Sequence, residues 1–166
     1  EAPGKDFVYV AGSFNNWAPN STYAMKKNTT GSKFWLELTG LTPGQVYTYQ
    51  YWVADQTPTT NSPNIVKTAD PCSTLVLSPN DDSGIPASSY PAMPAYPVGQ
   101  EREVTVLQTG QTPYNWQVTN FTKPEKDKLI VYEVLVREFD SDRNYQDLID
   151  KIDYFKNLGI NAIELK

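Results

Sequence analysis

The sequence contains no histidine and a single cysteine, Cys72. Without histidine, neither a Ser-His-Asp nor a Cys-His catalytic mechanism can operate within the chain. A lone cysteine also excludes an internal disulfide framework and a cysteine-rich zinc site. Because Cys72 follows Pro71 in an extended segment, we expect it to be a small core residue. We assign neither a metal nor a cofactor to the chain.

Basic runs and long apolar stretches are missing as well. The net charge of −5, without a basic cluster, argues against nucleic acid or an anionic membrane as the main partner. No apolar stretch reaches transmembrane length, and no signal-peptide pattern opens the sequence. We therefore predict neither a nucleic-acid partner nor a membrane partner.

Aromatic and turn-forming residues are abundant, with 11 tyrosines, 4 tryptophans and 13 prolines. Short alternating stretches at 7–12, 33–38 and 46–55 are separated by turn residues. Such spacing predicts a β-sandwich of immunoglobulin-like type over residues 1–78. A closed barrel fits less well because the spacing is uneven.

Residues 79–128 form a proline-rich connector in this interpretation. The stretch 79–100 is expected to run extended over a surface, with a peptide ligand for an SH3-type domain as the alternative. The stretches 103–108 and 115–121 are expected to form a β-hairpin that packs on the sandwich, with a pair of sheet-edge strands as the alternative.

The spacing between apolar residues changes in residues 129–166. Residues 129–136 are almost entirely apolar, which is typical of a strand buried on both faces. Apolar residues then recur at helical spacing over 145–158, and we expect Asp142 or Asn144 to cap this helix and Gly159 to end it.

A second buried strand is predicted at 160–165, which completes one βαβ crossover. One crossover leaves apolar faces and strand edges open, so we expect it to open a larger α/β fold that Lys166 cuts short. The alternative is that 129–166 docks on the sandwich as an added layer. We expect residues 129–166 to be covered, for example by self-association through this segment, or to be disordered.

Several motifs resemble one enzyme family in the family's own order. VYVAGSFNNW (8–17) resembles the start of carbohydrate-binding module family 48 and related early-set domains of starch- and glycogen-active proteins. YEVLVREF (132–139) and the stretch 145–165 resemble the first strand, first helix and second strand of the glycoside hydrolase family 13 barrel. The stretches 67–77 and 105–121 are similar to the connecting segments of these enzymes.

The resemblance implies the N-terminal part of an α-amylase or branching enzyme. Its fold would be mainly β: an early-set β-sandwich followed by a truncated βαβ unit of a (β/α)8 barrel. Family members carry their catalytic Asp, Glu and Asp after the fourth, fifth and seventh strands, which would lie beyond Lys166. The resemblance therefore implies no catalytic residue in this chain. Glu138 and Asp140 would line the rim of a full active site or form structural ion pairs. The acidic residues that are poor catalytic candidates are Glu133, Glu138, Asp140, Asp142 and Glu164.

The resemblance also implies a weak carbohydrate site. Trp17 matches the sugar-stacking Trp of the GSFNNW motif, and Gln50 stands where glycogen-binding relatives carry a Lys. A second Trp platform is missing from residues 54–64. In the alternative interpretation, Trp17 packs on the sandwich edge or against the barrel, and three other aromatic residues are core or interface. These residues are Tyr49, Tyr51 and Trp52.

The partner implied by the resemblance is an α-glucan, namely starch, glycogen or a maltooligosaccharide, bound through the parent enzyme. A stand-alone carbohydrate-binding module and a ligand-free structural domain are the alternatives. The resemblance further implies a bacterial enzyme, exported or periplasmic, although the residues themselves show no targeting signal. It leaves the choice between hydrolase and transferase open.

Overall fold

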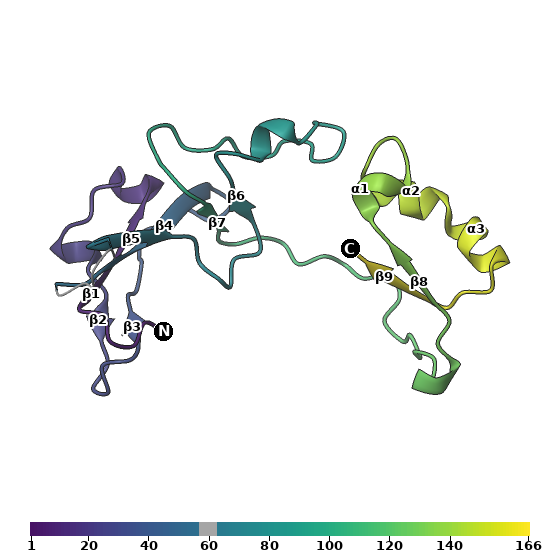
Figure 1. Ribbon diagram of the computed structural model, residues 1–166, viewed down its shortest axis with the longest axis horizontal. Coiled ribbons are helices and arrows are strands. Elements are labelled where there is room, and N and C mark those ends of the chain that lie inside the picture. The colour runs from purple at the N-terminus through teal and green to yellow at the C-terminus, as the bar shows by residue number, and fades with distance from the viewer. Residues whose placement is uncertain (57–62) are drawn as a thin grey trace. The chain divides into compact units, whose positions relative to one another are not determined.

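The chain is described by a computed structural model that covers residues 1–56 and 63–166, and it divides into two compact units (Figure 1). Unit 1 comprises Glu1–Ser83 and Pro94–Thr112, and unit 2 comprises Gly84–Met93 and Pro113–Lys166. The fold is mainly β with antiparallel sheets, as the sequence predicts. The expected connector 79–128 is shared between the two units rather than forming a section of its own.

A five-stranded antiparallel sheet organises unit 1. Its spatial order is β1-β4-β7-β6, and β5 pairs with the remaining part of β4. The central strand therefore has β1 on one edge, with β7 and β5 sharing the other edge. The strands are β1 (Phe7–Gly12), β4 (Val46–Ala54), β5 (Ile65–Thr68), β6 (Val76–Leu77) and β7 (Val104–Gln108).

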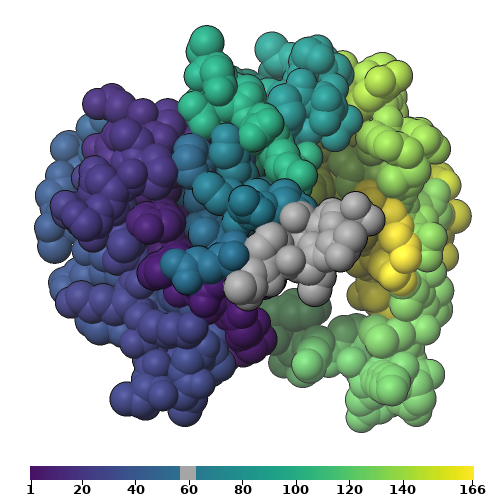
Figure 2. Space-filling model, turned by 60° about the vertical axis from the view of Figure 1, so that its left-hand side comes forward, coloured from purple at the N-terminus to yellow at the C-terminus, as the bar shows by residue number. Residues whose placement is uncertain are grey.

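A short two-stranded ribbon stands beside this sheet and protrudes from unit 1 in the space-filling view (Figure 2). It consists of β2 (Lys26–Lys27) and β3 (Phe34–Trp35). The Met25 amide donates a hydrogen bond to the Val8 carbonyl oxygen at 2.8 Å, which ties the ribbon to β1. Sheet and ribbon are consistent with the predicted β-sandwich. Three 3-10 turns accompany these elements: η1 (Ser13–Asn15), η2 (Ser21–Tyr23) and η3 (Asp82–Gly84).

Side chains alternate between the two faces of the sheet because successive residues of a strand point to opposite sides. Val8 lies opposite Val53, and Val10 lies opposite Tyr51, so these residues share one face. The other face carries the intervening residues of the same strands. The buried apolar residues of unit 1 are Val8, Val10, Ala11, Tyr47, Leu77 and Val104.

Two expectations for unit 1 are wrong. Residues 104–108 form β7 between β4 and β6, whereas 115–121 form no strand and belong to unit 2, so the predicted hairpin does not exist. Cys72 is exposed rather than a core residue. The Asp70 side chain accepts a hydrogen bond from the Cys72 amide at 2.8 Å and so forms a tight turn, which leaves the cysteine on the surface.

Unit 2 contains a parallel strand pair joined by helices, as expected for a βαβ crossover. Val131 lies opposite Ala162, and Val134 lies opposite Leu165. The elements are η4 (Lys126–Lys128), β8 (Val131–Val134), α1 (Val136–Phe139), α2 (Tyr145–Asp150), α3 (Ile152–Asn157) and β9 (Ala162–Leu165).

The predicted helix over 145–158 is present but interrupted at Lys151. Asn144 is its N-cap: the side-chain oxygen accepts hydrogen bonds from the Gln146 and Asp147 amides at 2.8 and 3.2 Å. Asp147 in turn accepts from the Asn144 amide at 3.3 Å, which completes a capping box. Gly159, with φ of 74°, ends the helix as predicted.

The core of unit 2 is small. Val134, Leu148 and Phe155 are buried, and the partly buried Tyr132 packs against them. The strand predicted to be buried on both faces is in fact half exposed in this chain, with Val131 at 51% exposure. Coverage of residues 129–166 by a second copy stays a prediction.

Gly12 provides a direct test of how closely β1 approaches β4. A Cβ atom at Gly12 would overlap the Thr48 carbonyl oxygen and lie 2.8 Å from the Tyr49 Cβ. We expect Gly12→Ala to lower the free energy of unfolding by about 1–3 kcal/mol, measured by urea denaturation. Gly84→Ala is the matched control because its Cβ would meet nothing within 4 Å. Equal stability of the two variants would contradict this close approach.

Candidate functional site

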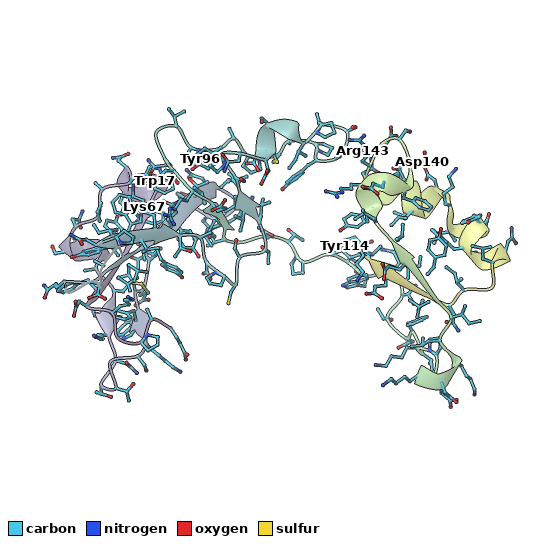
Figure 3. All side chains as sticks on the ribbon, viewed as in Figure 1. Trp17, Lys67, Tyr96, Tyr114, Asp140 and Arg143 are labelled. Carbon is cyan, nitrogen blue, oxygen red and sulfur yellow. The ribbon has the colours of Figure 1, made fainter. Side chains whose placement is uncertain are left out.

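Trp17 lies in a tightly built turn after β1. Its amide donates a hydrogen bond to the Gly12 carbonyl oxygen at 2.9 Å, while Asn16 and Trp17 both adopt left-handed φ values, 52° and 58°. The Asn15 side chain accepts from the Gly12 amide at 2.9 Å and donates to the Val10 carbonyl oxygen at 3.0 Å. The turn therefore fixes the backbone beneath a partly exposed indole ring, which Figure 3 labels.

Gln50 has a structural position rather than a surface one. Its side chain is fully buried, at 0% exposure. The Nε2 atom donates to the carbonyl oxygens of Glu101 and Glu103 at 2.8 and 2.9 Å. The Oε1 atom accepts from the Trp52 indole at 3.4 Å. In this arrangement Gln50 holds the segment before β7 against β4 and offers no surface to a sugar.

The face of the sheet that carries Gln50 also has a hollow with two aromatic residues, Tyr9 and Trp52. These two lie directly opposite each other in the β1–β4 pair. The hollow has a volume of about 340 Å³, and Asn20 and Ser21 supply polar groups beside the rings. Aromatic rings flanked by polar groups form the kind of surface on which a sugar ring stacks. Its full lining is Tyr9, Pro19, Asn20, Ser21, Trp52, Ala54 and Ile65.

Lys67 is placed against the same tryptophan. Its Nζ atom lies 4.4 Å from the centre of the Trp52 ring and 2.9 Å from the Glu101 carboxylate. The hydrogen bond and the charge of Lys67 lower the pKa of the exposed Glu101 carboxyl. Lys67 therefore restrains the Trp52 ring from β5.

The pairing of Tyr9 with Trp52 was missed in the sequence, where Trp52 is treated only as core or interface. The signal was the alternation itself: Tyr9 and Trp52 occupy the strand positions between the apolar residues of β1 and β4. The expected absence of a second platform in residues 54–64 lies partly outside the described residues, which omit 57–62.

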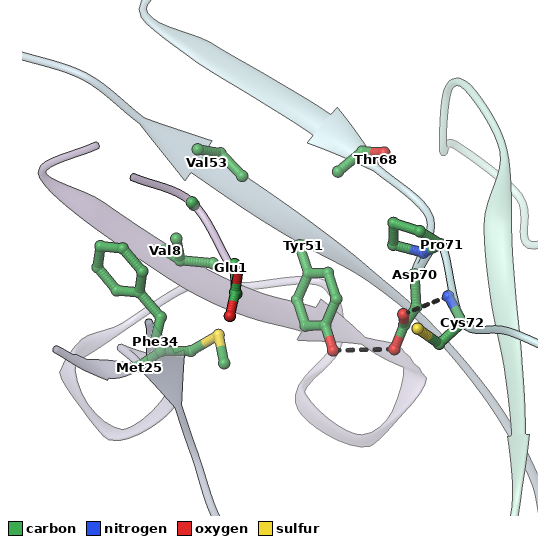
Figure 4. Close-up of a pocket in the computed structure, with 11 residues that line it drawn as sticks. Glu1, Val8, Met25, Phe34, Tyr51, Val53, Thr68, Asp70, Pro71 and Cys72 are labelled. Carbon is green, nitrogen blue, oxygen red and sulfur yellow. Dashed lines mark hydrogen bonds between the residues drawn. The ribbon is translucent and has the colours of Figure 1, made fainter. Parts of the chain in front are cut away.

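The opposite face of the sheet borders a second hollow, a cleft of about 390 Å³ between the sheet and the ribbon (Figure 4). At one end, the Asp70 carboxylate accepts hydrogen bonds from the hydroxyl groups of Tyr49 and Tyr51 at 2.9 and 3.0 Å. The Asp70 amide donates to the Thr105 hydroxyl at 2.7 Å, which anchors this segment to β7.

Burial and these hydrogen bonds together change the pKa values of Tyr49, Tyr51 and Asp70. Burial, reinforced by the hydrogen bond to Asp70, raises the pKa of the Tyr49 phenol well above its usual range. Burial also raises the pKa of Tyr51. Burial alone would raise the pKa of Asp70, but the hydrogen bonds from the Cys72 amide and the two tyrosines outweigh it and lower that pKa. Asp70 is therefore an anion at neutral pH.

The acidic residues of unit 2 are mostly paired with basic side chains. Lys166 lies 3.6 Å from the Glu133 carboxylate and 3.1 Å from that of Glu164. Asp140, labelled in Figure 3, pairs with Lys151 at 3.6 Å. Such contacts are typical of structural ion pairs.

Within residues 1–56 and 63–166, no group of three acidic, histidine or cysteine side chains is arranged to hold a metal ion. In the same residues, no helix is long and apolar enough to cross a membrane.

The Tyr49–Asp70 hydrogen bond predicts an alkaline effect on stability. Because the pKa of Tyr49 is raised in the folded state, its contribution is fully present below the unfolded-state pKa of about 10 and is lost as pH rises further. We expect Tyr49→Phe to lower the free energy of unfolding by about 1–2 kcal/mol at pH 7. The difference from the unmodified chain should shrink above pH 10, measured by urea denaturation across that range.

Tyr145→Phe is the control, since Tyr145 is an exposed tyrosine in unit 2. A difference between Tyr49→Phe and the unmodified chain that does not change with pH would contradict the assignment.

One comparison with known proteins gives a match. No protein-family model matches the chain. Over 90 residues, which are 54% of the chain, it is 28% identical to malto-oligosyltrehalose trehalohydrolase of Saccharolobus solfataricus. The matched stretch spans 15% of the length of that enzyme. The chain therefore has a distant link to the glycoside hydrolases.

Proposed function

We propose that the chain is the non-catalytic N-terminal part of an α-glucan-active glycoside hydrolase or transferase of the α-amylase type. The distant match to a malto-oligosyltrehalose trehalohydrolase supports this proposal. The order of elements supports it as well, because an antiparallel β unit is followed by a parallel βαβ unit. Unit 1 acts as the accessory sandwich, and unit 2 contributes the first strand, helix and second strand of the barrel.

The parallel pairing of β8 with β9 is the observation that carries this proposal. Parallel neighbours need a long crossover, and repetition of that strand–helix–strand unit builds a barrel. Here the crossover packs Leu148 and Phe155 onto Val134 from one face of the strand pair. The register places Val131 and Glu133 on the opposite face, which is the interior in a closed barrel.

Catalysis belongs to residues outside this chain in our proposal. A retaining glycosidase needs two carboxyl groups about 5 Å apart, one ionised and one protonated. Glu133 and Glu164 lie opposite each other in the β8–β9 register, but both contact the Lys166 ammonium group. These contacts have the form of structural ion pairs on the strand pair.

We expect residues 1–166 to release no reducing sugar from amylose or maltoheptaose above the buffer blank. Glu133→Gln and Glu164→Gln should leave that result unchanged, because these carboxylates serve the strand pair. The measurement is a reducing-end assay over several hours with an active α-amylase as positive control. A rate above the blank that either substitution abolishes would contradict the non-catalytic role.

Glucan binding by unit 1 is the second part of the proposal. Trp17 stands on a rigid turn, and Tyr9 with Trp52 lines the hollow on the Gln50 face of the sheet. Lys67 already restrains the Trp52 ring, so this side chain loses little conformational entropy when a sugar stacks on it. Gln50 contributes indirectly, through its contact with the Trp52 indole.

In a native gel that contains glycogen, we expect the chain to migrate more slowly than in a gel without it. Trp52→Ala and Trp17→Ala should each reduce this retardation by at least half. Trp35→Ala is the matched control, since Trp35 is an exposed tryptophan of the same unit, on the ribbon. Unretarded migration of the unmodified chain would instead favour a ligand-free packing role for unit 1. Equal loss in all three variants would exclude a specific site.

A further inference from the structure

The cleft between the sheet and the ribbon has walls that are mainly apolar. Val8 and Val53 of the sheet form one side, and Met25, just before the ribbon, and Phe34 of the ribbon face them (Figure 4). Its volume of about 390 Å³ falls within the range of small-molecule sites. The register of β1 and β4 places this cleft on the face opposite the Tyr9–Trp52 hollow, so the two sites are independent.

The polar end of the cleft is built around a single carboxylate. The Oδ2 atom of Asp70 accepts from both tyrosine hydroxyl groups, while Oδ1 accepts only from the Cys72 amide among the residues that the structure describes. A carboxylate oxygen can accept two hydrogen bonds, so Oδ1 retains capacity for one more donor. Each tyrosine hydroxyl group donates its one hydrogen bond to Asp70, and together they hold the carboxylate in place.

The charge at the polar end of the cleft favours a cation. Of the two acidic residues in its lining, Glu1 pairs with Lys33 at 3.3 Å, whereas Asp70 forms no ion pair with a basic side chain among the described residues. The lining itself contains no lysine or arginine side chain. An anion would meet repulsion there, and a purely apolar molecule would leave the Oδ1 acceptor unused.

We propose that this cleft binds a small organic cation, namely a protonated amine carried on an apolar body such as an aromatic ring. The amine donates a charge-assisted hydrogen bond to Asp70 Oδ1, and the apolar body lies between the ribbon and the sheet. The order of preference among ligands of one shape is then ammonium first, neutral alcohol second and carboxylate last.

Cys72 supplies the measurement, because the only thiol of the chain lies in the lining of the cleft and is exposed. The probe is phenethylammonium chloride, with 2-phenylethanol and phenylacetate as the neutral and anionic analogues. We expect phenethylammonium to slow the alkylation of Cys72 by N-ethylmaleimide in a saturable manner at neutral pH. The alcohol should require a roughly five- to tenfold higher concentration for the same protection, and phenylacetate should give none. Glutathione, treated in parallel, corrects for any direct effect of the probes on the reagent.

Two substitutions locate the site. Asp70→Asn removes the charge and should reduce the affinity for phenethylammonium to that for the alcohol, while Asp81→Asn, outside the cleft lining, should change nothing. Phe34→Ala shortens the apolar wall without touching the Asp70 hydrogen bonds. It should weaken phenethylammonium binding about fivefold and leave protection by propylammonium unchanged. If Asp70→Asn fails to fold, as circular dichroism would show, Phe34→Ala and the three analogues decide the question.

The proposal is overturned if phenethylammonium gives no saturable protection, or if the alcohol protects equally well. It is also overturned if a folded Asp70→Asn variant keeps full affinity. None of these results bears on glucan binding, because the glycogen assay reports on the other face of the sheet.

Discussion

The pairing of β4 on both of its edges is the constraint on which unit 1 depends. β1 occupies one edge of this strand, and β7 and β5 divide the other edge between them. A strand held on both sides cannot shift its register, because a slip by one residue would move every side chain to the opposite face. The alternation along Tyr49–Val53 therefore assigns each side chain to one of two surfaces, and both candidate sites follow from that assignment.

Gln50 shows how this constraint limits function. A buried amide must find hydrogen-bond partners for both its oxygen and its nitrogen, or folding loses about 1–3 kcal/mol for each group left alone. Gln50 finds them in the backbone of Glu101 and Glu103 and in the Trp52 indole. Its partners are therefore structural, and our proposal assigns the sugar-facing role to Tyr9 and Trp52 instead. A residue that aligns with a sugar-contact position of a family motif can thus be buried and have only structural contacts.

Local patterns in the sequence predicted the elements but not all their partners. The strands at 7–12 and 46–54, the parallel unit, the Asn144 cap and the Gly159 stop followed from period and cap chemistry. The hairpin at 103–121 failed because β7 pairs with β4, more than 50 residues away in sequence, and pairing over that distance leaves no local signal. The Asp70 cluster was missed for the same reason, whereas the alternation that places Tyr9 and Trp52 on one face of the sheet was present in the sequence but was not used.

The two units differ in what their polar side chains do. In unit 1, the Asp70 carboxylate accepts hydrogen bonds from two tyrosines of β4 and from the following turn, and within the described residues its Oδ1 atom has room for one further donor. In unit 2, Asp147 serves the helix cap, and Glu133 and Glu164 serve a shared lysine. A helix cap contributes about 1 kcal/mol and an exposed ion pair about 1 kcal/mol or less, so these contacts help to order a small core. In our proposals, binding is therefore the role of unit 1, whereas the polar residues of unit 2 hold a strand–helix–strand scaffold together.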